Sequence, residues 1–369
     1  MPPFLSVRGR QGRIGPVAFL LLATIVAACE IPSAPPRWET RWVVPAESTT
    51  IDVASMAPPG ITVSDDRTEL LVAVAGNGVA VSLGDLCAAC AAFNGQTVPK
   101  PPFTATVRAT TAFPTDIDSV TLTRGFIEVR ISNGTSFDLL RPSSAPGSAV
   151  GTFVVTVRGG GAVIAVRSIS GTTKSLPPGE TLVDTLTFDP AVLPRTIGSP
   201  VETEVSIDSP AGDPVIIDTA HSLTVDVGDA SVGVSAARVR VQSRTVSSAP
   251  ISLDLADLDA ALTDRVTNGA LLLEIDNPFA VAGDLTAIVS APGVTLVRPI
   301  AIVPGQSSPT LSFTGAELRS LFGQAVTLTI SGDVSAVDPG GMITVTPAMA
   351  LSVASRLELY LVTDVPEGQ

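Results

Sequence analysis

The sequence predicts an all-β protein built from tandem antiparallel β-sandwiches, and three observations lead to this fold class. Valine and threonine are abundant, as is typical of strands, while 31 glycines and 31 prolines provide many turns. Segments of about 5–8 residues with alternating apolar and polar side chains recur between turn signals. Long amphipathic helical patterns are almost missing, which favours packed sheets over helix-covered ones. The hydrophobic content of 45% is ordinary for a packed protein.

Residues 1–28 have the layout of a secretory signal peptide. Three arginines at positions 8, 10 and 13 precede an apolar run over residues 17–26, and two alanines follow it. The run is much shorter than the roughly 20 residues that a membrane-spanning helix needs. We therefore expect this segment to be cleaved rather than to remain as a transmembrane helix.

The sequence Val26-Ala27-Ala28-Cys29 resembles the lipobox of bacterial lipoproteins. The resemblance implies cleavage before Cys29, a diacylglycerol on its sulfur and an acyl chain on its new amino group. Several acyl chains on one residue give stable anchoring. Glu30 follows in place of the aspartate that favours inner-membrane retention, so the resemblance implies the outer membrane. The alternative is an ordinary signal peptide in which the cysteine is incidental.

The expected mature chain has 369 − 28 = 341 residues and a formal charge of 19 − 35 = −16, because three of the 22 basic residues leave with the signal. A chain this acidic has no basic surface with which to displace phosphate counterions, which argues against nucleic acid as a partner. Anionic headgroups should repel it as well. We therefore expect membrane contact through the lipid on Cys29 alone.

Residues 29–46 are rich in proline and predict a stiff tether between the lipid and the folded part. This segment also contains Trp38 and Trp42. One interpretation places the two rings at the headgroup level of the membrane. The preferred interpretation tucks them into the first strand of the fold, because residues 41–44 have the pattern of a strand start.

Residues 47–110 are predicted to form an N-terminal β-module. Two short strands, over residues 69–75 and 79–83, flank Gly76-Asn77-Gly78, which is typical of a tight hairpin turn. A turn-rich loop over residues 84–102 follows.

The rest of the chain contains an internal duplication, with β-sandwich repeat 1 over residues 111–245 and repeat 2 over residues 246–369. A strand ending in Asn133 matches one ending in Asn277, and several later features match in the same order. The first is a Pro-Gly pair (178–179 with 304–305), and the second is a strand ending in phenylalanine (185–188 with 310–313). A short helical turn with a capping residue follows (Asp189 with Thr314). The last is a segment that aligns without gaps (215–225 with 343–353). Two copies are too few for a solenoid, so they predict tandem domains.

The two copies differ in one connection. Asn133 and Pro178 are 45 positions apart, against 27 between Asn277 and Pro304, an excess of 18 residues in the first copy. Part of the excess is the Pro-, Ser- and Gly-rich segment 141–151, which predicts a surface loop insertion. A functional loop could lie there, although a tolerated insertion is the preferred interpretation.

The second copy also resembles the LEA-type (WHy) β-sandwich, through Asn277-Pro278-Phe279 and Val303-Pro304-Gly305. The first copy departs from this pattern, because Gly134 follows Asn133. The resemblance covers about 80 residues, and its motif is short. It implies an Ig-like or LEA-like sandwich and does not imply an activity.

Cys87-Ala88-Ala89-Cys90 is the most conspicuous reactive pattern in the chain. A disulfide between Cys87 and Cys90 that pins the loop is the preferred interpretation for an exported protein. A redox pair would need a βαβ context, and a zinc site would need two more ligands that the sequence does not supply nearby. We therefore predict no metal and no cofactor.

Catalytic side chains are scarce. His221 is the only histidine, which argues against Ser-His-Asp and Cys-His catalysis. Carboxylates cluster in three places, which suit solvated turns, a calcium site or glycoside hydrolysis in that order of preference (Asp65-Asp66; Asp116 and Asp118; Asp254, Asp257 and Asp259). We therefore predict that the protein is not an enzyme and assign no catalytic residue.

These observations predict a non-catalytic, lipid-anchored cell-envelope lipoprotein that acts as a structural or interaction module, through protein or glycan contacts. The alternative is a carrier of lipid or another small apolar ligand, since a β-sandwich can open to enclose an acyl chain. A third hypothesis is an envelope hydrolase that uses carboxylates alone, with Asp116, Asp118, Asp254 and Asp257 as candidates.

Overall fold

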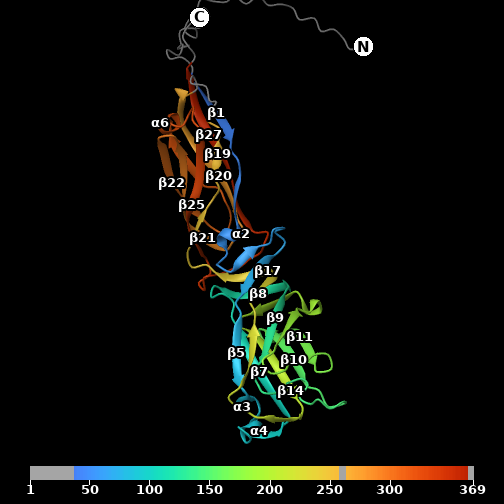
Figure 1. Cartoon of the computed structure of the whole chain (residues 1–369). Helices are drawn as coiled ribbons and strands as arrows, with labels where there is room; N and C mark the ends of the chain where they lie inside the picture. The colour runs from blue at the N-terminus through green and yellow to red at the C-terminus, as the bar shows by residue number, and fades with distance from the viewer. Residues whose placement is uncertain (1–36, 257–262, 365–369) are drawn as a thin grey trace, which may run out of the picture.

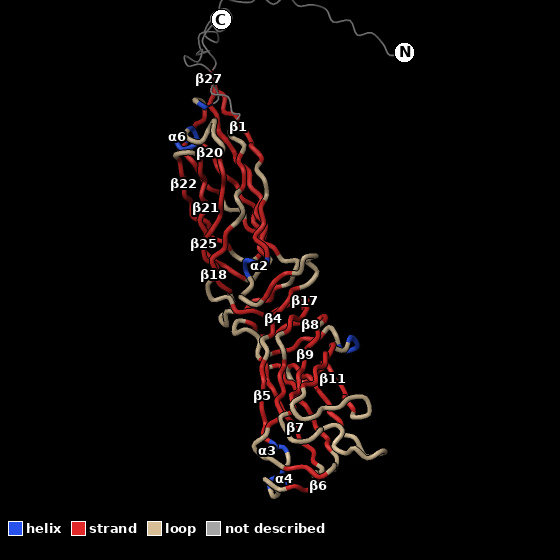
Figure 2. Tube along the Cα trace, in the orientation of Figure 1, coloured by secondary structure: helices blue, strands red, loops and turns tan. Residues whose placement is uncertain are grey.

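A computed structural model describes residues 37–256 and 263–364, and the described chain is all-β, as predicted (Figures 1 and 2). It forms two β-sandwiches placed end to end in an elongated molecule. The signal peptide, Cys29, Asp257 and Asp259 lie outside the described residues. The first and last described strands pair with each other, so the two ends of the described chain meet at one end of the molecule.

The C-terminal sandwich contains two antiparallel sheets. One has the order β1-β27-β20-β23, with β2 beside β27 and β24 beside β20, and the other has the order β18-β25-β21-β22, with β19 beside β25. The bounds are β1 Arg37–Pro45, β2 Thr49–Asp52, β20 Val266–Asn277, β23 Gly305–Ser307, β24 Thr310–Thr314, β27 Ala350–Asp364, β18 Arg244–Ser247, β19 Ile251–Leu253, β21 Val281–Ala291, β22 Val294–Ile302 and β25 Val326–Ala336.

The N-terminal sandwich contains two four-stranded sheets, with the orders β12-β9-β16-β5 and β11-β10-β14-β7. A two-stranded sheet of β6 and β15 extends it at the far end. The bounds are β5 Asn77–Ser82, β9 Phe126–Asn133, β12 Thr181–Thr187, β16 Ser222–Val227, β7 Phe103–Thr111, β10 Thr152–Gly159, β11 Ala162–Ser170, β14 Val201–Ser209, β6 Thr97–Pro99 and β15 Pro214–Ile216.

A third sheet, the junction sheet, lies between the two sandwiches. Its order is β13-β8-β17-β4-β3, and β26 pairs with β17. Because β26 comes from the second repeat and the other strands come from earlier parts of the chain, this sheet joins the two halves through backbone hydrogen bonds. The bounds are β3 Ile61–Val63, β4 Leu70–Val74, β8 Ile117–Arg124, β13 Arg195–Gly198, β17 Ala230–Arg240 and β26 Met342–Val345.

Alternation of side chains forms the cores as the sequence predicts. In β9, Ile127, Val129 and Ile131 are buried, whereas Glu128 and Arg130 point outward and pair with each other. Short helical segments interrupt the described strands, among them α2 Val53–Met56, α3 Leu83–Leu86, α4 Ala88–Ala91, η1 Pro190–Val192 and α6 Gly315–Arg319. Asp189 caps η1 and Thr314 caps α6 through a capping box, at the matching positions of the two repeats.

The duplication is visible in the topology. In one sheet of each sandwich, β12-β9-β16-β5 corresponds to β24-β20-β27-β1, and in the other β11-β10-β14-β7 corresponds to β22-β21-β25-β18. His221 and Met349 lie in equivalent turns of the two repeats, since the backbone amide of each donates to the carbonyl three residues earlier. His221 therefore lies in the turn before β16 and not within the strand.

Asn133 and Asn277 form the same buried network in the two repeats. Each side-chain amide donates to two carbonyls on different segments of the chain, at 2.7–3.0 Å (Phe137 and Leu176 in the first repeat, Val281 and Val303 in the second). Each side-chain oxygen accepts the backbone amide two residues later. Because both asparagines are buried, these bonds fix the crossing between the sheets without competition from water.

The module predicted over residues 47–110 does not form a unit of its own. Its strands join partners in both sandwiches, since β2 pairs with β27, β4 with β17, β5 with β16, and β7 with β14. The tether predicted over residues 29–46 is likewise too long, because residues 37–45 form β1 at the edge of the C-terminal sandwich. Pairing partners at least 90 residues away decide these strands, and local sequence carries no information about them.

The hairpin predicted around Asn77 is also wrong. β4 and β5 do not pair with each other but continue from the junction sheet into the N-terminal sandwich, along β17 and then β16. The glycines serve close backbone approach instead of a reversal: a Cβ on Gly76 would lie 2.5 Å from the carbonyl oxygen of Val227.

We predict that a fragment of residues 246–364 folds poorly, because it lacks β1 and β2 and leaves the 15-residue strand β27 without its edge partners. A rearranged fragment in which a short turn joins Asp364 to residues 37–52 should fold, since Arg37 already lies opposite Asp364. Circular dichroism and urea unfolding compare the two. Equal stability of both fragments would contradict the role of β1 and β2.

We also predict that Asn133→Ala and Asn277→Ala each lower the free energy of unfolding by about 2–3 kcal/mol, because each leaves buried backbone groups without partners. The exposed Asn268→Ala is the matched control and should change it by less than about 0.5 kcal/mol. Denaturant unfolding followed by far-UV circular dichroism measures the difference. A similar result for all three variants would refute the importance of the buried networks.

Candidate interaction site at the tip of the molecule

The tip is the end of the N-terminal sandwich that lies opposite the first and last described strands (Figure 1). It comprises α3, α4, the β6–β15 pair and the loops at the same end, which include the insertion 141–151. The insertion is held there by backbone bonds, since Gly151 donates to Leu140 and Asp213 donates to Pro142. The structure thus gathers two features that the sequence singled out separately, the cysteine pair and the insertion.

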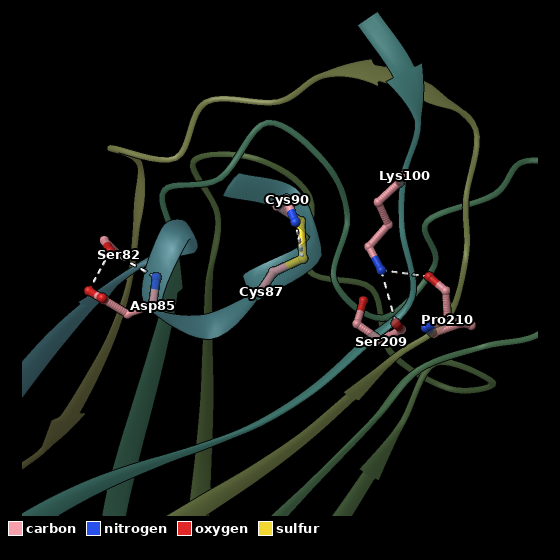
Figure 3. Close-up of a disulfide and its surroundings, with 7 residues drawn as sticks. All are labelled: Ser82, Asp85, Cys87, Cys90, Lys100, Ser209 and Pro210. Atoms are coloured by element: carbon pink, nitrogen blue, oxygen red, sulfur yellow. Dashed lines mark hydrogen bonds between the residues drawn. A yellow bond between two sulfur atoms is a disulfide. The ribbon is translucent and has the colours of Figure 1, made fainter. Parts of the chain in front are cut away.

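Cys87 and Cys90 form the predicted disulfide (Figure 3). The segment is not the plain loop that we expected. Ser82 caps α3 by accepting the amide of Asp85, and Cys87 lies at the start of α4. Both cysteines are buried, so a reductant or a substrate thiol has no path to the sulfur atoms. The pair therefore suits a structural role better than a redox role.

Lys100 is the most unusual residue of the tip, because it is a charged side chain that is only 1% exposed. Its Nζ donates to the carbonyl oxygens of Ser209 at 3.0 Å and Pro210 at 2.5 Å (Figure 3). It also lies 4.7 Å from the ring centre of Phe103 and 5.3 Å from that of Phe137. Two carbonyl dipoles and two ring faces thus replace the water that a lysine normally binds.

Burial lowers the pKa of Lys100 from about 10.5 to about 7, and the negative charge of Asp208 opposes this shift only in part. The physical cause is the loss of hydration of the ammonium group. Lys100 was missed as a site residue in the sequence. Its one signal in the sequence is rarity, since it is one of only two lysines.

Asp213 attaches the insertion to the loop that holds Lys100. Its carboxylate accepts the Ser143 hydroxyl at 2.9 Å and both the amide and the hydroxyl of Ser144 at 2.8 Å. These three bonds lower the pKa of Asp213, because they stabilise the charged carboxylate. The backbone of Asp213 accepts the amide of Lys100, so the insertion and the lysine belong to one bonded unit.

Three large apolar side chains are exposed on this tip, and one of them is Val150 of the insertion. Phe93, just after α4, is 37% exposed, and Ile216, at the end of β15, is 59% exposed. Backbone hydrogen bonds connect the two segments that carry the latter two side chains, because the amide of Ile217 donates to the carbonyl of Gln96 and the amide of Gln96 donates to the carbonyl of Phe93. Exposed apolar side chains on a rigid, disulfide-bonded tip are suited to contact with another molecule.

Among the described carboxylates of the hydrolase hypothesis, Asp116 and Asp254 line separate hollows, the first beside Arg240 and the second beside Glu47. Asp66 accepts the Ser64 hydroxyl at 2.6 Å and the Thr68 amide at 3.2 Å, as expected of a turn, and these bonds lower its pKa. Asp118 lies 3.8 Å from the guanidinium of Arg238. Within residues 37–256 and 263–364, no group of three or more His, Cys, Asp or Glu side chains could hold a metal ion.

His221 has no nucleophile bonded to it in the described structure. Its Nε2 lies 3.5 Å from Oδ2 of Asp218, and both side chains are about half exposed. The nearby Ser82 hydroxyl bonds to Asp85 as a helix cap. This arrangement is that of a surface turn and not of a catalytic triad.

Four hollows of about 170–540 Å³ occur on the described surface, and they lie outside the sandwich cores. One of about 450 Å³ lies near the junction, between residues 52–54, residues 63–67 and residues 347–350. Another of about 470 Å³ lies on the outer face of β7, β10 and β14 and is lined mainly by small polar residues. The inner faces of the sheets are filled by side chains such as Phe153 and Phe279.

No helix among the described residues is long and apolar enough to cross a membrane. No protein-family model matches the sequence, and no curated protein matches it either. The resemblances to the lipobox and to the LEA-type sandwich therefore stay predictions.

Several solved structures share a low similarity with this chain. A protein of Parabacteroides distasonis ATCC 8503 that is inferred to be secreted has 10% identity and a TM-score of 0.35, and the match covers 87% of this chain and 99% of that one. PNGase F, a glycosylasparaginase from Flavobacterium meningosepticum, has 10% identity and a TM-score of 0.18, with coverage of 78% and 100%. The tandem CBM22 domains of Paenibacillus barcinonensis Xyn10C have 11% identity and a TM-score of 0.16, with coverage of 79% and 99%. These values assign neither an activity nor a ligand to the chain.

We predict that the free energy of unfolding rises as the pH increases from 7 towards 9, by up to about 1.4 kcal/mol per pH unit, through Lys100. In this range the unfolded chain keeps the lysine proton, whereas the folded chain, with its pKa of about 7, has released it. Stability therefore increases with pH and falls as the pH returns to 7.

Urea unfolding at several pH values measures this slope. Lys100→Met keeps an apolar side chain of similar size against Phe103 and should abolish the slope, whereas Lys174→Met, at an exposed position, should retain it. An unchanged slope in the Lys100→Met variant would show that the lysine is not the group responsible.

Proposed function

We propose that this protein is a non-catalytic, lipid-anchored component of a bacterial cell envelope that holds an interaction module away from the membrane. The lipid on Cys29 anchors it, in the outer membrane, and the tip contacts an envelope protein or glycan. The resemblance of residues 26–29 to a lipobox supports the anchor.

The observation that carries this proposal is the pairing of Arg37 with Asp364, which sets the start of the fold at the end of the C-terminal sandwich. A chain anchored at Cys29 then has that sandwich next to the membrane, and the N-terminal sandwich projects outward (Figure 1). The order of the domains from the membrane is thus the reverse of their main order in the sequence. Phe93 and Ile216, two of the exposed apolar residues of the tip, then lie far from the bilayer.

The filled interiors of the two sandwiches favour an interaction module over a carrier of lipid or apolar ligands. An acyl chain needs an apolar cavity, and pockets for ligands of drug size have volumes of roughly 300–1,000 Å³. Three hollows of that size on the described part of the chain lie on loops and outer faces with mixed polar linings. The absence of a nucleophile bonded to His221 in the described chain supports a role without catalysis.

Energy transfer to a membrane dye tests the orientation. The acylated chain is placed in vesicles that contain an acceptor-labelled lipid, and a donor dye is attached at Glu39→Cys or at Lys174→Cys. Both positions are exposed, the first on β1 and the second in a loop of the tip. Because Cys87 and Cys90 are bonded to each other and Cys29 is acylated in this proposal, only the introduced thiol reacts.

We expect strong transfer from position 39 and little or none from position 174. Equal transfer from both positions would mean that the molecule lies flat and would refute the projecting tip. Mass spectrometry of the N-terminal peptide, with Cys29→Ser as the unacylated control, tests the anchor itself.

A further inference from the structure

β1 carries two tryptophans that the fold leaves uncovered. In the antiparallel register Trp42 lies opposite Leu359, and Thr40 lies opposite Leu361. Leu359 and Leu361 are buried, so alternation places Trp38 and Trp42 on the core side of the sheet. The expectation that the first strand tucks the rings into the fold is nevertheless wrong, because Trp38 is 62% exposed and Trp42 is 43% exposed.

The reason is the position of β1 at the edge of its sheet. β27 pairs with β1 along nine residues, whereas the facing sheet ends on this side with two short strands, β18 of four residues and β19 of three. In the described chain the rings of Trp38 and Trp42 are thus left in contact with water, which is unfavourable unless another surface covers them.

The length of chain before β1 indicates which surface is available. Residues 29–36 number eight, so Arg37 lies within roughly 29 Å of Cys29 even for a fully extended chain. Three of these eight residues are prolines, and a polyproline conformation shortens the reach to about 25 Å. A lipid on Cys29 thus holds the tryptophan face beside the bilayer surface.

We propose that the Trp38–Trp42 face of β1 docks onto the headgroup layer of the phospholipid bilayer, as a second, non-covalent contact. This inference rests on the anchor in the proposed function. Tryptophan suits the layer because its ring is apolar and its N–H can donate to polar headgroup atoms. It differs from the expectation of membrane contact through the lipid alone, since the rings carry no charge and are not repelled by anionic headgroups.

The strand geometry gives the two rings different depths. Trp38 and Trp42 are four residues apart, which is about 13 Å along the strand. Trp38 is closer in sequence to Cys29 and lies at the end of the molecule where β1 begins (Figure 1). Trp38 therefore lies deeper in the headgroup layer than Trp42.

Tryptophan fluorescence tests this directly, because the chain has only these two tryptophans. The acylated mature chain is placed in phosphatidylethanolamine and phosphatidylcholine vesicles with or without lipids brominated near the headgroup. Trp38→Phe and Trp42→Phe each leave one ring as the reporter. The Cys29→Ser chain without vesicles provides the emission of the free face.

We expect emission at shorter wavelength on vesicles, and a loss of emission with brominated lipid that is larger for Trp38 than for Trp42. Absence of quenching in a chain that still floats with the vesicles would refute the docking and leave the anchor intact. A chain that does not float would remove the anchor and this inference together. Emission of the Cys29→Ser chain that is already at short wavelength would also overturn the docking, since it would mean that a second copy or the chain itself covers the rings.

Discussion

The pairing of β1 with β27 is the constraint on which the arrangement of this protein depends. It joins residues that are more than 300 positions apart, with nine backbone partners in register from Arg37 opposite Asp364 to Pro45 opposite Arg356. It gives the long strand β27 a partner on its otherwise open edge. The same pairing brings both ends of the described fold to one end of the molecule. The direction in which the N-terminal sandwich projects follows from this single pair of strands.

The two repeats share one topology, but the corresponding strands are continuous in the second repeat and interrupted in the first. In the second repeat β20 and β27 run unbroken over 12 and 15 residues. In the first repeat Gly125 separates β8 from β9, and residues 228–229 separate β16 from β17. The outer pieces, β8 and β17, form the junction sheet, while the inner pieces, β9 and β16, stay in the sandwich. A Cβ on Gly125 would lie 2.6 Å from the ring of Phe188, so glycine is required where the strand breaks. Because the strands break there, the first repeat contributes β8 and β17 to the junction sheet, which connects the two sandwiches.

Sequence alone predicts the local features well. The alternation in β9, the caps at Asp189 and Thr314, and the disulfide were all predictable, because each depends on residues a few positions apart. The boundaries of the N-terminal part were not, since β4 and β5 look like a hairpin while their real partners are β17 and β16. The register and the alternation of side chains also show which face of a strand points towards the core, but not whether another element covers that face. For that reason alternation placed Trp42 correctly on the core side of β1 and still failed to predict its exposure.

The topology also implies an order of folding. Apart from β26, the strands of the N-terminal sandwich and the junction sheet lie between residues 61 and 240, so this part has nearly all its partners once residue 240 is available. The C-terminal sandwich cannot close until β27 meets β1, which is the first strand of the described chain and the last to find its partner. Loop-closure entropy grows only slowly with length, so the wait costs little stability but delays completion. Until β1 finds β27, both strands have open edges that favour wrong pairing.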